Sequence, residues 1–194
     1  MRTEWEKMIA GEPYRALDPE LSALRRRARH LTRELNASRD DEEVLRARLL
    51  RELIPNAGPG LWIEPPFYCD YGRNITAGER VFMNFDCVIL DVAPVVIGDC
   101  VKFGPAVQVY TATHPVDAAE RRSGIEFGKP ISIGADVWVG GAAVICPGVS
   151  IGSRTIIGAG SVVTRDIPSD VFAAGNPCRV VRQLNKAELE GTTR

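Results

Sequence analysis

IGADVW-VGGAAV-ICPGVS-IGSRTI-IGAGSV-VTRDIP, residues 133–168, is the stretch of this chain that decides the fold. It divides without a gap into hexads, each beginning with Ile or Val and most carrying Gly second. A six-residue step does not match the 3.6-residue turn of an α-helix, and glycine is costly inside one. The period instead predicts very short strands and tight turns, with one aliphatic side chain per hexad pointing inward. Three such strands make one triangular coil, and stacked coils bury a continuous core.

The fifth residue of each hexad is nearly always small, as in Ala143, Thr155 and Ser161, and we expect it to fit the tight corners. The same frame recurs upstream as IGDCVK-FGPAVQ-VYTATH from Ile97 and, more loosely, as ITAGER-VFMNFD-CVILDV from Ile75. The sequence therefore predicts a mainly β protein, with a parallel β-helix over residues 57–184.

The frame breaks once, at the polar stretch PVDAAERRSGIEFGKP, residues 115–130. Its irregular order predicts a loop extruded from the solenoid over about residues 114–130. Long loops inside compact repeats are usually functional. His114 lies at the base of this loop, so it attracts attention as a candidate functional residue.

The first 56 residues follow a helical rhythm, and we expect them to form a cap segment over the open first coil. Asp18 is the predicted N-cap of the first helix and Pro19 its first residue. A second helix is predicted from about Asp41, ending before Pro55. Residues 185–194 form a tail in which a short helix is expected over about 185–190. The predicted apolar face of the first helix comprises Leu17, Leu21, Leu24, Ala28, Leu31 and Leu35, and that of the second comprises Leu45, Leu49, Leu50 and Leu53.

Composition excludes several classes of protein. The formal net charge is −1, with 45% hydrophobic and 25% charged residues, which gives no reason to expect a nucleic-acid or membrane partner. The start of the chain lacks the pattern of a signal peptide and no stretch is apolar enough to span a membrane, so a cytoplasmic location is expected. The basic run Arg25, Arg26, Arg27 and Arg29 is interpreted as a solvated helix face, since Glu20 and Glu34 flank it.

Two histidines are present, His30 and His114. A neutral imidazole at the mouth of a loop can remove a proton from an attacking hydroxyl, which makes His114 a candidate general base. The alternative is a histidine that only anchors the loop, and His30 is interpreted as a surface residue. No metal is expected, because a hexapeptide-repeat carbonic anhydrase needs three histidines for zinc. The cysteines have no histidine near them in the sequence and none resembles an activated nucleophile: Cys69 and Cys87 fall on inward positions, Cys100 and Cys146 on turns.

Several stretches resemble the maltose, galactoside and nodulation acetyltransferases, a subgroup of the hexapeptide acyltransferases, and the maltose type most of all. They are AGEPYR, IEPPFYCDYG, FMNFDCVILD, YTATHP, GKPISIGADVWVGG, GAGSVVTRDIP and GNPCRVVR, from residue 10 to residue 182. The resemblance implies a left-handed β-helix, acetyl-CoA as co-substrate, and a homotrimer with active sites between subunits. It also implies that His114 is the catalytic base and that Asn84 holds the acceptor or the developing oxyanion.

The resemblance further assigns residues to the two substrates. Galactoside members have Tyr where this chain has Phe82 and differ at Asp70 and Glu126, which favours a glucose- or maltose-type acceptor. Galactoside or amino-sugar acetylation remains an alternative, and a non-catalytic scaffold is an alternative of another class; antibiotic acetyltransferases lack the N-terminal helical segment. The implied acceptor contacts are Asp70, Phe82, Asp91 and Glu126, and the implied acetyl-CoA contacts are Trp138, Gly141, Ala159, Thr164, Arg165, Arg179 and Arg182.

Overall fold

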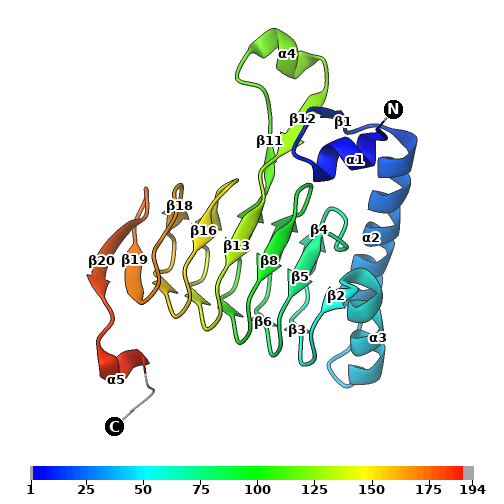
Figure 1. Cartoon of the computed structure of the whole chain (residues 1–194). Helices are drawn as coiled ribbons and strands as arrows, with labels where there is room; N and C mark the ends of the chain where they lie inside the picture. The colour runs from blue at the N-terminus through cyan, green and yellow to red at the C-terminus, as the bar shows by residue number, and fades with distance from the viewer. Residues whose placement is uncertain (1, 190–194) are drawn as a thin grey trace.

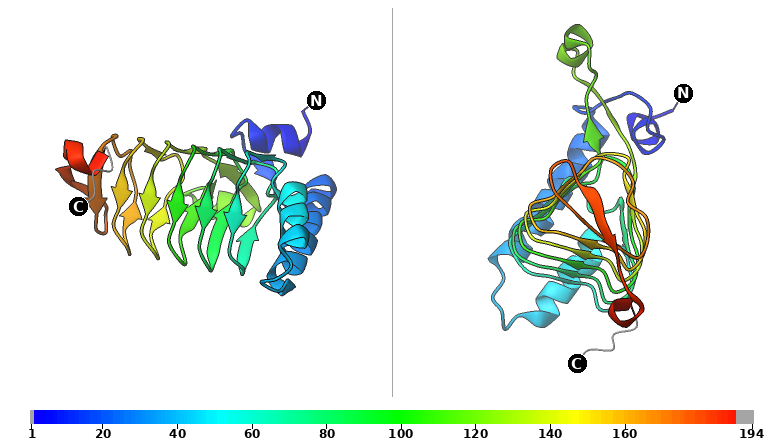
Figure 2. Two further views of the ribbon diagram at one scale, coloured as in Figure 1. Left: turned by 90° about the horizontal axis from the view of Figure 1, so that it is seen from below. Right: turned by 90° about the vertical axis from the view of Figure 1, so that its left-hand side faces the viewer.

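The computed structural model describes residues 2–189 and shows a β-helix of stacked coils with a helical segment across its N-terminal end (Figure 1). Viewed along its axis, the solenoid is triangular (Figure 2). Its three walls are called here the first, second and third faces. The first face comprises β2 (Asn56–Ala57), β5 (Ile75–Ala77), β8 (Val95–Ile97), β13 (Ile131–Ile133) and β16 (Ser150–Ile151).

The other two faces are sheets of the same kind, and neighbouring solenoid strands pair in parallel. The exception is the last pair, β19 with β20, which is antiparallel. The second face comprises β3 (Trp62–Ile63), β6 (Phe82–Met83), β9 (Lys102–Phe103), β14 (Trp138–Val139), β17 (Ile156–Ile157), β19 (Val171–Ala174) and β20 (Arg179–Gln183). The third comprises β4 (Phe67–Cys69), β7 (Cys87–Leu90), β10 (Gln108–Tyr110), β15 (Val144–Ile145) and β18 (Val162–Val163).

The hexad pattern explains the core. Ile97, Ile133 and Ile151 pair in register on neighbouring strands, so equivalent aliphatic positions stack along the axis. Glycine at the second position lets the coils approach closely: a Cβ on Gly98 would lie 2.6 Å from the Ala135 amide nitrogen. The first residues of the six consecutive hexads are all buried: Ile133, Val139, Ile145, Ile151, Ile157 and Val163.

Each corner of the solenoid uses the fourth and fifth residues of a hexad in different ways. In the first five of the six consecutive hexads the positive φ angle falls on the fourth residue, as in Asp136 (φ 58°) and Arg154 (φ 56°). The fifth residues, including Ala143, Thr155 and Ser161, are buried. They are small because they point into the narrow interior of the triangle at its corners, where a large side chain has no room.

The N-terminal segment contains α1 (Glu4–Ile9), α2 (Pro19–Ala37) and α3 (Glu43–Leu53). Asp18 caps α2 as predicted, because its Oδ1 accepts from the amides of Glu20 and Leu21. Leu17 was expected on the buried face of that helix but is 88% exposed, because it precedes the cap residue and the helical periodicity does not reach it. Helices α2 and α3 pack together across the first coil (Figure 1).

The extruded loop is more ordered than its sequence predicts. Strand β11 (Ala112–Thr113) leads into the loop, which contains α4 (Ala118–Arg122) and β12 (Ile125–Gly128). Strand β12 pairs antiparallel with β11 on one side and with β1 (Tyr14–Arg15) on the other, which joins the loop to the N-terminal segment. Of the expected tail helix, α5 (Lys186–Leu189) is observed, and residue 190 lies outside the described part. None of the helices described is both long and apolar enough to cross a membrane.

Candidate active site

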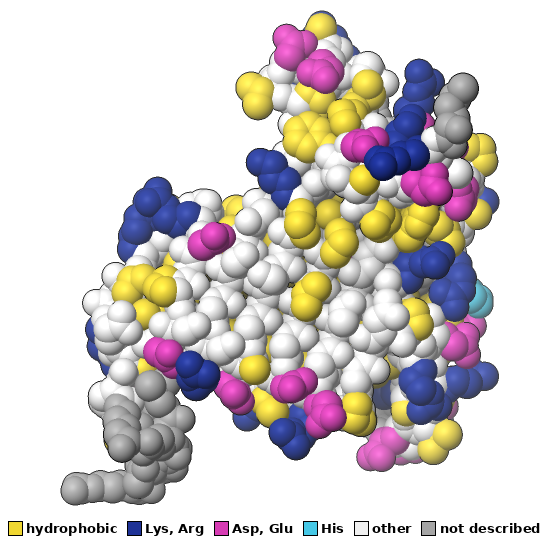
Figure 3. Space-filling view, in the orientation of Figure 1, with side chains coloured by type: hydrophobic (Ala, Val, Ile, Leu, Met, Phe, Trp, Pro, Cys, Tyr) yellow, Lys and Arg dark blue, Asp and Glu magenta, His cyan; other side chains and the backbone are white. Residues whose placement is uncertain are grey.

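A cavity of about 330 Å³ lies where the extruded loop and the N-terminal segment meet the first coils of the solenoid. Figure 3 shows hydrophobic side chains gathered at this junction. The cavity brings together residues from four distant parts of the chain. They are Tyr14, Ala16, Leu17, Arg25, Arg29, Asp70, Tyr71, Leu90, Val92, Ala112, His114 and Glu126.

One wall of the cavity is the solenoid edge between the third and first faces. Successive coils contribute to it Asp70 with Tyr71, then Leu90 with Val92, and then Ala112 with His114. Because these pairs lie at or just beyond the ends of strands β4, β7 and β10 in one parallel sheet, the coil spacing sets their separation. The opposite wall comes from α2, from the segment around β1, and from Glu126 on β12.

His114 follows β11 directly and is exposed at the cavity. Pro115, the next residue, is buried, which fixes the chain where it leaves the solenoid. The Arg121 guanidinium donates to the carbonyls of Pro115 (2.9 Å) and Val116 (3.0 Å) and so closes the turn that follows His114. A rigid backbone thus presents an open imidazole, as a general base acting on a bound hydroxyl requires.

Two carboxylates face the same cavity. Burial raises the pKa of Asp70, and the nearby guanidinium groups of Arg25 and Arg29 oppose that shift. Glu126 Oε2 accepts a hydrogen bond of 3.0 Å from the Tyr14 hydroxyl, and burial is the main reason that the pKa of Tyr14 is raised. Carboxylates held in this way can accept hydrogen bonds from the hydroxyls of a polar ligand.

Asp91 does not reach the cavity, although it was expected to contact the acceptor. Its exposed fraction is 0%, and its carboxylate accepts from the backbone amides of Asp70, Tyr71 and Asn74. The expectation of direct contact is therefore wrong in this structure, because burial and backbone hydrogen bonds occupy the carboxylate.

Asn84 and Phe82 also lie away from the cavity. Both come from the β6 coil segment, and Asn84 marks the edge between the second and third faces, one edge away from His114. Asn84 Oδ1 accepts from the next amide, that of Phe85, at 2.8 Å. Within one chain, therefore, the two predicted catalytic residues are not brought together.

The predicted acetyl-CoA contacts follow the C-terminal half of the solenoid. Gly141 and Ala159 lie on the same edge as Asn84, and Trp138 on the second face is 55% exposed. Thr164 and Arg165 follow β18, on the edge that carries His114. Arg179 and Arg182 belong to β20, where Arg182 pairs with Glu188 and the Arg179 guanidinium donates to the Cys178 carbonyl.

Sequence reasoning missed the contribution of the N-terminal segment to this cavity. Arg25 was assigned to a solvated face, but it donates to the Tyr71 hydroxyl at 2.6 Å and to the Ala16 carbonyl, and its guanidinium lies over the Tyr71 ring. Arg29, one turn further along α2, lines the same cavity. Arg25 follows Leu21 by four residues, so the two lie on the same face of the helix, and this spacing could have indicated that Arg25 points toward the solenoid.

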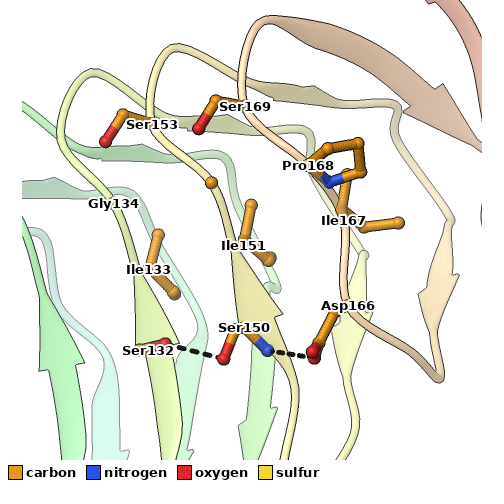
Figure 4. A pocket seen from close by; sticks show the side chains of 11 residues that line it. Ser132, Ile133, Gly134, Ser150, Ile151, Ser153, Asp166, Ile167, Pro168 and Ser169 are labelled. Carbon is orange, nitrogen blue, oxygen red and sulfur yellow. Dashed lines mark hydrogen bonds between the residues drawn. The ribbon is translucent and has the colours of Figure 1, made fainter.

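A second, shallow depression lies on the first face near the C-terminal end (Figure 4). The Ser132 and Ser150 hydroxyls lie 3.0 Å apart there, and Asp166 accepts from the Ser150 amide. These polar groups form hydrogen bonds with one another between neighbouring coils, and no histidine lines the depression. Within residues 2–189, no cluster of three His, Cys, Asp or Glu side chains could hold a metal ion.

Comparison with known proteins identifies the family. Residues 7–58 match the maltose acetyltransferase hexapeptide capping motif, and residues 130–165 match the bacterial transferase hexapeptide repeat. Nodulation protein L of Rhizobium meliloti is 50% identical over 92% of this chain and 98% of its own. Galactoside O-acetyltransferase of Escherichia coli is 42% identical over 93% and 89%.

Solved structures agree. A maltose O-acetyltransferase from Clostridium difficile superposes with a TM-score of 0.94 at 48% identity, covering 95% of this chain and 99% of that one. A galactoside acetyltransferase in complex with coenzyme A gives a TM-score of 0.93 at 40% identity, covering 97% and 94%. These matches confirm the resemblance seen in the sequence motifs. The chain belongs to the hexapeptide-repeat O-acetyltransferases, in the group that contains the maltose, galactoside and nodulation proteins.

Proposed function

We propose that this protein transfers the acetyl group of acetyl-CoA to a hydroxyl of a glucose- or maltose-type acceptor, with His114 as general base. The observation that carries the proposal is that His114, Asp70 and Glu126 line the same cavity. Two carboxylates suit a ligand with several hydroxyl groups, and an imidazole beside them suits deprotonation of one of those groups. The similar proteins are named as acetyltransferases, which disfavours the alternative that this chain is a non-catalytic scaffold.

In the proposed reaction, His114 accepts the proton of the sugar hydroxyl as its oxygen attacks the thioester carbonyl. The carbon–oxygen bond forms, the carbon–sulfur bond breaks, and the proton held by His114 passes to the departing thiolate. Atoms and charges balance without an acyl-enzyme. Base catalysis of this kind is typically worth about 10²–10⁴-fold, and the positioning of both substrates supplies much of the remaining acceleration.

The positions proposed for acetyl-CoA fit its chemistry. Trp138 offers an exposed indole face on which a flat base can stack, while Arg165 and Arg179 are exposed guanidinium groups that bind phosphate well. A side chain at Gly141 would press on the neighbouring coil, since its Cβ would lie 3.0 Å from the Pro105 carbonyl oxygen. The edge is therefore smooth enough for an extended pantetheine arm.

We further propose that the active enzyme is a homotrimer in which neighbouring subunits share each site. His114 and Asn84 lie on two different edges of the solenoid, so one chain alone does not join them. The third face lies between those two edges. The outward-pointing residues that pair with one another on its successive strands are mainly apolar: Tyr68, Val88, Gln108, Val144 and Val162. Tyr68 is 53% exposed in the single chain, which suits contact with another copy.

The expected cytoplasmic location of the protein stays a prediction.

Acceptor preference tests the assignment of the sugar. Glucose or maltose should exceed a matched galactoside in kcat/KM by tenfold or more, since one poorly made hydrogen bond costs ~1.4 kcal/mol. Glu126→Met should narrow that difference by weakening glucosyl acceptors, because it removes a carboxylate from the cavity. Thiol release from acetyl-CoA measures both.

Glu120→Met is the matched control, since Glu120 is exposed on α4 of the same loop and does not line the cavity. It should leave the preference unchanged. Galactosides that prove better acceptors than glucosides with the unmutated enzyme would contradict the roles given to Asp70 and Glu126.

A further inference from the structure

A fully buried carboxylate lies behind the wall of the cavity. Asp91 stands between Leu90 and Val92, which both line the cavity, yet its own side chain has no exposed surface. Its Oδ1 accepts from the amides of Asp70 (3.0 Å) and Tyr71 (2.8 Å), and its Oδ2 from the amide of Asn74 (3.3 Å). The Asn74 side-chain amide returns a hydrogen bond of 2.7 Å to the Asp91 carbonyl.

These bonds tie one coil to the corner of the coil before it, and that corner carries the part of the cavity wall contributed by Asp70 and Tyr71. The next coil repeats the device with a neutral group: the Thr111 hydroxyl accepts from the Ala93 amide and donates to the Leu90 carbonyl. Successive buried side chains thus fasten the edge of the solenoid from Asp70 to the base of the loop that carries His114.

The charge on Asp91 is costly to the fold. Burial raises the pKa of Asp91 to about 7 from an ordinary value of 3.8, and the neighbouring carboxylate of Asp70 adds to the rise. The other titratable groups that face it are the Cys69 thiol and the Tyr71 hydroxyl. Because the folded chain then holds the proton more tightly than the unfolded chain, this group's contribution to stability falls as pH rises from about 4 to about 7.

We propose that Asp91 is a positioning residue for the acceptor: it holds Asp70 and Tyr71 in the geometry that binds the sugar. This rests on the proposed function, since the ligand is the sugar acceptor assigned above. Asp91 acts through backbone amides and touches no substrate. Three backbone amides converge on Asp91, and a carboxyl group with two oxygens can accept from all three, whereas the single hydroxyl of Thr111 accepts from one.

Two variants test the proposal. Asp91→Ala removes the three hydrogen bonds that the Asp91 carboxylate accepts and should raise the acceptor KM by about tenfold or more, while the acetyl-CoA KM stays within about twofold. Asp91→Asn keeps an Oδ1 that can accept from Asp70 and Tyr71, so it should return the acceptor KM to within about threefold of the unmutated value. The matched control is Asp99→Ala, which removes a similar bond to the Glu79 amide away from the cavity and should change neither KM.

Amide hydrogen exchange supplies a readout independent of catalysis. The amides of Asp70 and Tyr71 should exchange much faster in Asp91→Ala than in Asp91→Asn, with the rest of the solenoid unchanged. If the unmutated protein acetylates no sugar, the proposed function fails while exchange still reports on the corner. Equal rises in both KM values, an Asn variant as impaired as the Ala variant, or unchanged exchange at Tyr71 would each overturn the positioning role.

Discussion

His114→Ala should lower turnover by at least two orders of magnitude while acetyl-CoA binding stays nearly intact. The reason is that the imidazole faces the cavity where the acceptor hydroxyl is proposed to bind, whereas the positions proposed for acetyl-CoA lie along other coils. Loss of a general base typically costs about 10²–10⁴-fold. Steady-state kinetics with saturating acceptor, together with calorimetry of coenzyme A binding, measure the two effects.

His30→Ala is the control. His30 lies on α2, its side chain is 61% exposed, and Glu34 is its neighbour at 3.0 Å, so its removal should change almost nothing. Near-normal turnover in His114→Ala would remove the general-base assignment. A loss of coenzyme A binding equal to the loss of turnover would place His114 in the cofactor site instead.

Mixing two inactive variants should restore activity if subunits share sites. His114→Ala and Asn84→Ala chains each lack one of the two proposed catalytic groups, but a mixed assembly of the proposed trimer contains some interfaces with both groups intact. Random assembly from equal amounts gives about a quarter of sites intact, because each intact site needs one particular chain on each side. Unfolding and refolding the mixture together, followed by the thiol assay, measures the recovery.

The two single variants refolded separately serve as controls, and sedimentation should report a trimer for every sample. If His114 and Asn84 of one chain formed the site together, no mixture could contain an intact one, and the mixture would stay inactive. An active monomer would likewise contradict the shared site.

The hexad period predicted the fold because it is a local property. Each hexad encodes one short strand, one turn and one inward-pointing side chain, and each coil packs only against its two neighbours. The interruption of the period located the extruded loop and His114 for the same reason. Small fifth residues were predicted to fit the tight corners, and Ala143 and Ser161 are buried there, while the positive φ angles fall one residue earlier.

The cavity could be predicted only in part, because it depends on contacts distant in sequence. Tyr14 meets Glu126 through the pairing of two-residue β1 with β12, and a strand of two residues has no pattern to detect. Arg25 looked like part of a charged helix face, since its partner Tyr71 lies 46 positions away. Asp91 is a carboxylate, as a sugar contact often is. Its burial and its hydrogen bonds to backbone amides become visible only in the structure.

The most direct test of the account is a mass balance on the unmutated enzyme with acetyl-CoA and maltose or glucose. We predict that thiol is released only when sugar is present, in equal amount to acetylated sugar, and that intact-protein mass spectrometry finds no acetyl group on the enzyme during turnover. An acetylated enzyme that forms and decays at the rate of turnover would contradict direct transfer assisted by His114, as would thiol release that leaves the sugar unmodified.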